Sequence, residues 1–185
     1  MPLLQGFFVA ILIATGFEQS EMIGPKRALE DAGATVHIVS PVPGKVQGWD
    51  WILMQPKDDF AVDISLNDAN ANDYDALVLP GGLNSPDDLR LDDKAVAFVR
   101  AFKNKPIAAI CHGPWLLINA ELVKNRKVTS WASIKVDLIN AGAKWIDQEV
   151  VQDGNLITSR MPDDVPAFSK AMIKLFAETM AKKRQ

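Results

Sequence analysis

Cysteine, histidine and basic charge are all scarce in this sequence, and each scarcity excludes a class of protein. The 185 residues contain one cysteine and two histidines, and they carry a formal net charge of −3. A single cysteine cannot form an intrachain disulfide, which favours a reducing compartment, and we expect a cytoplasmic protein. The negative charge argues against a general nucleic-acid binder, because such proteins normally carry a basic surplus. With so few thiol and imidazole ligands, a zinc site is not expected either.

Long apolar runs and phosphate-binding loops are absent as well. The stretch from Gly6 to Ala14 is strongly apolar but far too short to cross a bilayer. No positive charge precedes it and no clear cleavage pattern follows, so a buried first strand is a better interpretation than a signal peptide. Neither GxGxxG nor GxxxxGK followed by serine or threonine occurs, so nucleotide binding has no support. We therefore expect no cofactor, no metal ion and no membrane contact.

Short apolar runs alternate with helical patterns along the chain, and this alternation predicts an α/β fold with a parallel sheet and helices on both faces. Strands are predicted at 7–14, 35–41, 75–82, 105–110 and 127–130. Helices are predicted at 20–33, 92–105 and 113–125. In the first helix, Ser20 is the expected N-cap and Gly33 the expected stop, and Gly24-Pro25 is expected to bend the helix or break its first turn.

The remaining segments add smaller elements to this frame. Between residues 42 and 66 the pattern changes to β-hairpin material inserted into the α/β frame. A helix is predicted at 133–142, and short strands at 144–151 and 155–159 meet at Asp153-Gly154, a favourable tight-turn pair. A final helix begins at about Val165. No repeat or linker interrupts the chain, so we expect one domain over residues 1–185.

Groups capable of chemistry follow several of the predicted strands. In open α/β sheets, ligands bind beyond the carboxyl ends of the strands, so residues just past those ends are expected to converge. Glu18 follows the first strand, and Trp131 follows the strand at 127–130. The other candidates lie at the end of the strand at 75–82 or after the strands at 75–82 and 105–110: Gly81, Gly82, Asp87, Asp88, Cys111, His112 and Gly113.

Cys111 admits two interpretations. Free cysteine is among the most buried residue types, so it can simply fill space at the end of a strand. However, a strand, one cysteine, a glycine two residues later and a helix start together indicate a strand–turn–helix elbow that exposes a nucleophile. The start of the helix adds backbone N–H groups and partial positive charge, which favour the thiolate. We favour the reactive thiol.

Each neighbouring candidate also admits an interpretation without a catalytic role. If Glu18 faces Cys111, burial and like charge raise the pKa of its carboxyl, and it can act as general acid and base; otherwise it is a solvated carboxylate. His112 is either the general base for the thiol or a histidine satisfied by solvent. Gly81 and Gly82 can present N–H groups to an oxyanion or can form a plain turn. Trp131, with Gly113, is a candidate for substrate binding, although core or interface packing is the commoner role of tryptophan.

Five stretches resemble one family in order along the chain. They are GFEQSE, DALVLPGG, AAICHGPWLLINA, KVTSWASIKVDLINAGAKW and VVQDGNLITSR. Together they resemble the PfpI-type intracellular protease family, within the superfamily of the Parkinson-associated deglycase, and the resemblance covers residues 8–177. It implies a flavodoxin-like three-layer sandwich with a class I glutamine-amidotransferase-like fold.

The same resemblance implies a site. Cys111 is the nucleophile, Glu18 is hydrogen-bonded to its sulfur, and His112 places the chain in the branch with histidine after the nucleophile. An acidic residue of a neighbouring subunit completes the triad in that branch, and Asp87 stands at that position where the best-known member has glutamate. A homodimer or higher oligomer, with sites near the interface, is therefore expected.

Three activities follow from the resemblance and stay open at this point. The first is cofactor-free conversion of a small carbonyl substrate, a 2-oxoaldehyde or glycated group, of the glyoxalase III or deglycase kind. The second is hydrolysis of a peptide by an intracellular cysteine peptidase or amidase. The third is a stress-response role in which Cys111 acts as a non-enzymatic redox sensor. We favour the first, because a small site with one thiol and two proton carriers is sufficient for it.

Overall fold

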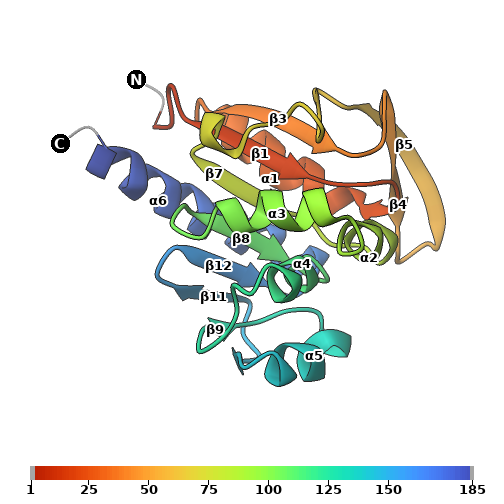
Figure 1. The fold of residues 1–185 in the computed structure, drawn as a ribbon, viewed down its shortest axis with the longest axis vertical. Helices are drawn as coiled ribbons and strands as arrows, with labels where there is room; N and C mark the ends of the chain where they lie inside the picture. Colours follow the sequence, from red (N-terminus) through yellow and green to blue (C-terminus); the bar gives the residue numbers. More distant parts are fainter. Residues whose placement is uncertain (1–2, 184–185) are drawn as a thin grey trace.

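Seven strands form the central sheet of the protein, whose residues 3–183 are described by a computed structural model. The strand order is β11-β12-β8-β7-β1-β3-β6, and each neighbouring pair is parallel except the antiparallel pair β11 and β12. The strands are β1 (Phe8–Leu12), β3 (Thr35–Ser40), β6 (Ile64–Ser65), β7 (Ala76–Leu79), β8 (Ile107–Ile110), β11 (Val150–Asp153) and β12 (Leu156–Ser159). Figure 1 shows this sheet between layers of helices, so the predicted three-layer flavodoxin-like α/β fold is confirmed.

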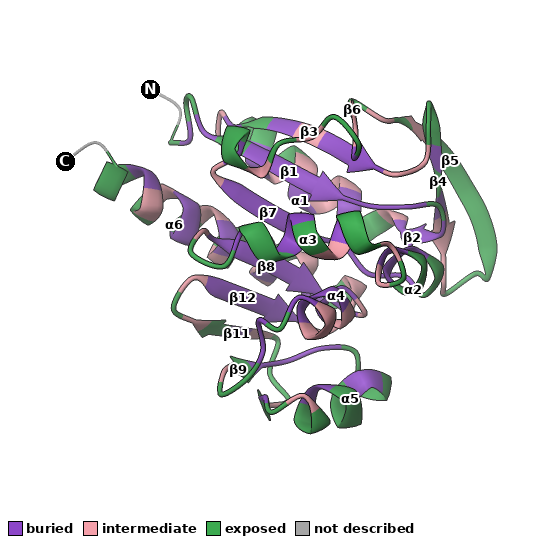
Figure 2. Ribbon diagram, viewed as in Figure 1, coloured by how far each residue is buried: buried purple, intermediate pink, exposed green. Residues whose placement is uncertain are grey.

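Helices cover both faces of the sheet, and each face has its own hydrophobic core. The helices are α1 (Gln19–Asp31), α2 (Asn84–Leu89), α3 (Asp93–Ala101), α4 (Pro114–Asn119), α5 (Lys135–Asn140) and α6 (Val165–Lys183). Alternate residues of β1 enter opposite cores, with Ile11 packing on the α1 and α6 side and Leu12 on the α3 and α4 side. Figure 2 shows the central strands buried, as expected for a parallel sheet covered on both faces.

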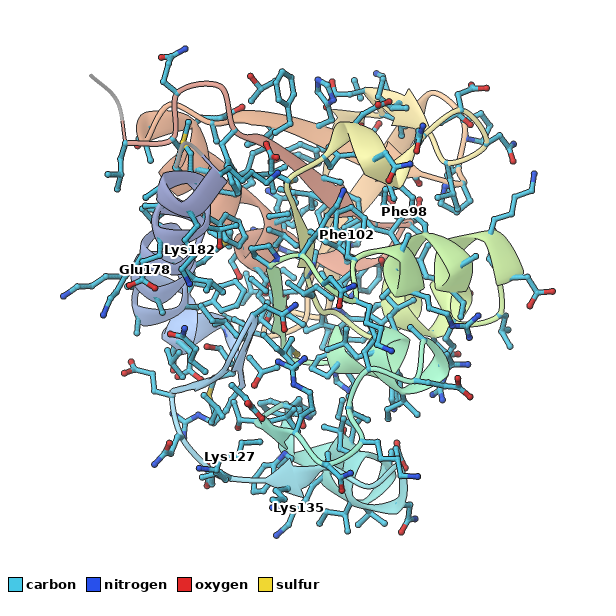
Figure 3. All side chains as sticks on the ribbon, turned by 60° about the vertical axis from the view of Figure 1, so that its left-hand side comes forward. Phe98, Phe102, Lys127, Lys135, Glu178 and Lys182 are labelled. Carbon is cyan, nitrogen blue, oxygen red and sulfur yellow. The ribbon has the colours of Figure 1, made fainter. Side chains whose placement is uncertain are left out.

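The two outer helix layers show the amphipathic pattern that fixes them to the sheet. Phe98 in α3 and Phe102 just after it are buried and lie on the side of the helix nearer the sheet (Figure 3). On α6, Glu178 and Lys182 are exposed and lie on the outer side of the helix (Figure 3). None of the helices in residues 3–183 combines the length and the apolar character needed to cross a membrane.

The predicted hairpin insertion forms a separate small sheet. Strands β2 (Phe17–Glu18), β4 (Lys45–Asp50) and β5 (Gln55–Ala61) make this sheet in the order β2-β4-β5. Val46 lies opposite Phe60, and the Phe60 ring meets the Phe17 ring at 5.8 Å, which fixes the hairpin against the start of α1. The last part of the predicted insertion is different, because β6 returns to the central sheet and pairs with β3.

Several predicted boundaries are wrong for local reasons. Helix α1 begins two residues after Phe17 with Glu18 as N-cap instead of Ser20, since the Glu18 carboxylate accepts the N–H of Ser20. The helix is also not broken at Gly24-Pro25, whereas the expected stop is confirmed, because the helix ends just before Gly33, which has a φ of +94°. Helix α4 is much shorter than predicted and stops before Glu121, whose φ is +62°.

The segment after α4 also differs from the prediction. Strand β9 (Lys127–Val128) does not join the central sheet and instead pairs with β10 (Lys144–Trp145). The predicted strand at 144–151 is therefore two strands, β10 and β11. The turn at Asp153-Gly154 does connect β11 to β12, as expected. Three short 3₁₀ turns complete the structure: η1 (Ala71–Asp73), η2 (Ala132–Ile134) and η3 (Pro162–Asp164).

Candidate active site

A cavity of about 520 Å³ lies beyond the carboxyl ends of the central strands. The chain runs from β1 to β3 on one side and reaches β7 and β8 on the other, so this edge contains the point where the strand order reverses. The cavity is lined by Glu18, Glu21, Trp51, Ile52, Gly82, Leu83, Cys111, His112, Trp131, Ser133, Met161, Pro162 and Asp163. Most of the predicted site residues therefore do converge at one edge of the sheet.

Cys111 occupies a strained elbow between β8 and α4. Its φ is +61°, a conformation that residues with a side chain rarely adopt. The backbone on both sides is tied down, because its N–H donates to the Ser159 carbonyl at 3.1 Å and its carbonyl accepts the Trp131 N–H at 3.0 Å. The side chain is 7% exposed and lines the cavity. This is the geometry of a nucleophile presented by a tight turn.

The carboxyl group beside the sulfur belongs to Glu21, and the expected contact of Glu18 with the sulfur is wrong. Glu21 Oε2 accepts the Gly81 N–H at 2.9 Å, and this carboxyl lies close enough to the Cys111 thiol to raise the pKa of that thiol. The absence of a side chain at Gly81 makes this possible, since a Cβ there would lie 2.5 Å from Glu21 Oε2 and 3.0 Å from Cys111 Sγ. Glu18 lines the cavity but directs its carboxylate to Ser20 and to the Trp51 N–H.

Burial opposes ionisation of Glu21. The side chain is fully buried, and burial raises the pKa of its carboxyl well above the usual value. The negative charges of Glu18 and Asp164 raise this pKa further, whereas the Gly81 N–H lowers it. The second oxygen, Oε1, has no hydrogen-bond partner within the described chain. Glu21 is therefore suited to hold a proton at neutral pH and to release it to a base.

The Cys111 thiol titrates together with this carboxyl. Burial raises the pKa of the thiol, and the negative charge of Glu21 raises it further. The backbone N–H groups of Gly82 and His112 face the sulfur and act in the opposite direction. Because burial opposes ionisation of both groups and each negative charge disfavours the other, the pair binds its protons more tightly than either group would alone, and a single remaining proton can be carried by either atom.

Glu21→Gln is expected to stabilise the protein, and more so at high pH. Because folding raises the pKa of Glu21, the stability contributed by its protonated form is fully present below about pH 4.5. This stability is lost as the pH rises through the pKa of the folded state. Glutamine does not titrate and avoids this loss. Thermal unfolding at pH 5 and pH 8 measures the effect, with about 2–4 °C expected for each ~1 kcal/mol gained. An equal gain at both pH values, or a loss at pH 8, would contradict it.

His112 lies next to the sulfur, and within residues 3–183 no acidic side chain is hydrogen-bonded to its ring. Its Nδ1 is 3.3 Å from Cys111 Sγ, and its Nε2 is 3.2 Å from Ser133 Oγ. The ring lies against Trp115, with the centroids 5.1 Å apart. Burial lowers the pKa of His112 to about 4, so the imidazole is neutral at neutral pH. It is available as a base, with Ser133 fixing its ring.

The other predicted residues divide into two groups. Gly82, with a φ of +82°, and Trp131 both line the cavity, and Gly113 packs behind the elbow. Asp87 is exposed in α2 and does not line the cavity, so its expected contact with a neighbouring subunit stays a prediction. Across residues 3–183, no group of three or more His, Cys, Asp or Glu side chains is placed to hold a metal ion.

Glu21 is a candidate site residue that the sequence did not lead us to predict, although a signal was present. Glu21, Pro25 and Leu29 recur every four residues and are all buried on one side of α1. A carboxylate in an apolar stripe of a helix is unusual and indicates a special environment. The cavity walls from the hairpin and from the loop before α6 gave no such signal.

This geometry has a counterpart among known proteins. The sequence profile of the DJ-1/PfpI family matches residues 8–175. The chain belongs to this family. General stress protein 18 of Bacillus subtilis is 45% identical over 172 residues, which are 90% of this chain and 96% of that protein. The putative cysteine protease YraA of the same organism is 41% identical, with 90% of this chain and 96% of that protein covered.

Two further members illustrate the breadth of the family. The deglycase TK1284 of Thermococcus kodakarensis is 42% identical, covering 90% of this chain and 98% of its own. Among solved structures, a two-domain protein of Anabaena variabilis with DJ-1/ThiJ/PfpI-like and ferritin-like domains has a TM-score of 0.83 and 35% identity. This chain is covered to 91% and spans 47% of that larger protein. The family predicted from the sequence motifs is thus confirmed.

Proposed function

We propose that this protein is a cofactor-free enzyme that uses Cys111 to convert 2-oxoaldehydes or related glycated groups. The observation that carries the proposal is the strained Cys111 with the buried Glu21 carboxyl close to its sulfur, in an open cavity with a largely apolar lining. A thiol and a proton carrier in one small site are the groups that this chemistry needs. Relatives named as deglycases support the same class of substrate.

The first step is addition of the thiol to the aldehyde. The sulfur forms a bond to the aldehyde carbon while the C=O π electrons move to oxygen, and the thiol proton passes to that oxygen through Glu21 or His112. The product is a hemithioacetal. The N–H groups of Gly82 and His112, which face the sulfur, are placed to stabilise the oxyanion during the addition.

The second step moves a hydrogen between the two substrate carbons. Glu21, once it has released its own proton to solvent, removes the proton from the former aldehyde carbon, and the electron pair forms an enediolate with the negative charge on the former ketone oxygen. The former ketone carbon then receives the proton from the Glu21 carboxyl while the hydroxyl proton of the former aldehyde carbon passes to the former ketone oxygen, which gives a thioester of a 2-hydroxy acid. Water attacks the thioester carbon, the C–S bond breaks, and the acid and the free thiol are restored. The raised pKa of Glu21 suits a group that both accepts and donates a proton.

The test is direct. The purified protein is expected to convert methylglyoxal and water to lactate, and Cys111→Ala is expected to reduce the rate to the level without protein. Lactate is measured by chromatography, and the folded state of the variant is checked by thermal unfolding. Absence of lactate above the Cys111→Ala background would remove this function.

A cysteine peptidase or amidase is the second candidate, favoured by the 3.3 Å approach of His112 Nδ1 to Cys111 Sγ. Its relative YraA is named a putative cysteine protease. In this chemistry Asp87 of a neighbouring subunit would have to replace Ser133 as the partner of His112, so a homo-oligomer is required. Hydrolysis of a chromogenic peptide amide that is lost in both Cys111→Ser and Asp87→Asn would support it. Activity that survives Asp87→Asn would exclude this triad.

A further inference from the structure

The hairpin between β4 and β5 forms one wall of the active-site cavity. Trp51 and Ile52, at the turn, line the cavity together with Leu83 and Trp131. The cavity volume of about 520 Å³ is in the range of pockets that enclose drug-sized ligands, roughly 300–1,000 Å³. A three-carbon aldehyde leaves most of that space empty. The wall is therefore available for a group on the substrate other than the reacting carbonyls.

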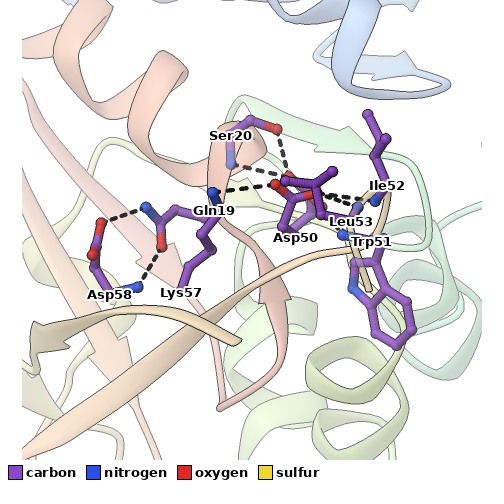
Figure 4. Close-up of polar contacts among 9 residues, drawn as sticks. Gln19, Ser20, Asp50, Trp51, Ile52, Leu53, Lys57 and Asp58 are labelled. Atoms are coloured by element: carbon purple, nitrogen blue, oxygen red, sulfur yellow. Dashed lines mark hydrogen bonds and ion pairs between the residues drawn. The ribbon is translucent and has the colours of Figure 1, made fainter. Parts of the chain in front are cut away.

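The wall is tied to α1 through Glu18. Its Oε2 accepts the Trp51 N–H at 3.1 Å, and its Oε1 accepts the Ser20 N–H at 3.2 Å and the Ser20 hydroxyl at 2.7 Å. The side chain is only 6% exposed. Figure 4 shows Ser20, at the start of α1, and Trp51, in the turn, which are the donors of these contacts. A buried carboxylate with three donors around it is a rigid connection, because each donor fills a lone pair that water cannot reach.

Two neighbouring contacts stiffen the same hairpin. Gln19 pairs with Asp58, donating to its carboxylate at 2.7 Å and accepting its N–H at 2.9 Å. Asp50 accepts the N–H groups of Ile52 at 3.0 Å and Leu53 at 2.9 Å, which closes the turn (Figure 4). Glu18 is the member of this set that touches both the cavity and the turn.

The Trp51 indole is not fixed by a hydrogen bond of its own. Its Nε1 is buried without a partner among residues 3–183, and its ring lies 5.6 Å from the Trp49 ring. The position of Trp51 in the wall therefore depends on its backbone bond to Glu18 and on ring packing.

We infer that Glu18 is a positioning residue that holds the Trp51–Ile52 wall, and that this wall selects substrates with an apolar or aromatic group beside the reacting carbonyls. The inference rests on the proposed function for the reaction, but the selectivity belongs to the cavity itself. Apolar side chains dominate the lining: Trp51, Ile52, Leu83, Trp131, Met161 and Pro162. An apolar substituent gains from contact with them, whereas methylglyoxal has only a methyl group to offer.

The first experiment compares phenylglyoxal with methylglyoxal, which differ only in the apolar group. We expect the ratio of their kcat/KM values to favour phenylglyoxal and to fall about five-fold in Ile52→Ala, because a few lost carbon contacts have effects of this size. Glu18→Gln is expected to lower the ratio similarly, mainly by raising KM for phenylglyoxal, since an amide offers one acceptor oxygen to three donors. Leu53→Ala is the matched control: Leu53 is next to Ile52 but does not line the cavity, and the ratio should stay within about two-fold.

The second experiment keeps the inference testable if no 2-oxoaldehyde is turned over. Phenacyl bromide and bromoacetone alkylate thiols and differ by the same phenyl-for-methyl exchange. We expect the ratio of alkylation rates, phenacyl bromide over bromoacetone, to be higher for Cys111 than for free glutathione; this difference is the excess preference. The excess preference should fall in Ile52→Ala and Glu18→Gln but not in Leu53→Ala. Intact-mass measurement gives the rates. Lack of turnover with this pattern intact would remove the proposed function alone.

Two results would overturn the inference. One is a wild-type protein that shows no excess preference for the aromatic reagent, which would mean that the wall does not select. The other is a preference that survives in Glu18→Gln while it is lost in Ile52→Ala, which would mean that Glu18 does not hold the wall. Because Ile52 is 78% exposed, Ile52→Ala is expected to fold normally, so the wall can be tested even if Glu18→Gln is unstable.

Discussion

Glu21→Gln is expected to reduce the rate of methylglyoxal conversion by about 100- to 10,000-fold, the usual contribution of a general acid–base group. Glutamine fills the same space and can still accept the Gly81 N–H, but it cannot carry a proton from one substrate carbon to the other. Stopped assays of lactate at saturating methylglyoxal report the loss in kcat. Cys111 should still react with iodoacetamide in this variant, which shows that the loss lies in proton transfer and not in access to the thiol.

Glu18→Gln is the matched comparison, since both residues are glutamates of the same cavity separated by less than one helical turn. Glu18 contacts Ser20 and Trp51 and not the sulfur, so its replacement should lower kcat for methylglyoxal less than about ten-fold. A larger loss in Glu18→Gln than in Glu21→Gln would reverse the assignment and restore Glu18 as the proton carrier.

Gly113→Ala is expected to destabilise the protein by about 3 kcal/mol or more and to lower the melting temperature by roughly 6–12 °C. An added Cβ would overlap with the Leu79 carbonyl oxygen of β7 and would lie 2.9 Å from the Ile110 carbonyl oxygen. Both are backbone atoms of central strands, so neither can move without disturbing the sheet. The elbow would shift instead, and Cys111 with it, so activity should fall together with stability.

Gly24→Ala provides the control for this prediction. The new methyl group would lie 2.5 Å from Val165 Cγ1, so that side chain has to shift, but no backbone atom outside the helix lies within 4 Å. Alanine is also favoured over glycine inside a helix by about 1 kcal/mol. Thermal unfolding of both variants should therefore show a large loss for Gly113→Ala and a much smaller change for Gly24→Ala. Similar melting temperatures for the two variants would show that the elbow tolerates a side chain.

The layers of the fold and the succession of strands and helices along the chain were predictable from the sequence, because apolar runs and helical periodicity are local signals. The ends of helices and strands were harder to predict where the backbone conformation of a single residue ends the element. Helix α4 has a continuous helical pattern to Asn125, yet it stops at Asn119, since the chain adopts a left-handed conformation at Glu121. The pairing of β9 with β10 depends on contacts far apart in the chain, and no local pattern encodes it.

The sequence was sufficient to predict the Cys111 elbow, but not which side chains contact Cys111 and His112. Position after a strand was sufficient to select Cys111. The choice between Glu18 and Glu21 depends on where α1 begins, because each residue turns the helix by about 100°. With Glu18 as N-cap, Glu21 falls in the first turn and faces inward; with Ser20 as N-cap, that orientation cannot be deduced. The contact of Ser133 with His112 is likewise tertiary.

The path of the chain around the hairpin has a consequence for how such proteins diversify. β3 leaves the central sheet at Ser40, and β6 returns at Ile64 to pair with the same strand. The two strands between them, β4 and β5, belong to the smaller sheet, so their length and sequence are not set by the register of the central strands. Recombination at the two ends of the hairpin can therefore exchange this wall of the cavity for another sequence. Glu21 on α1 and Cys111 at the elbow would be retained.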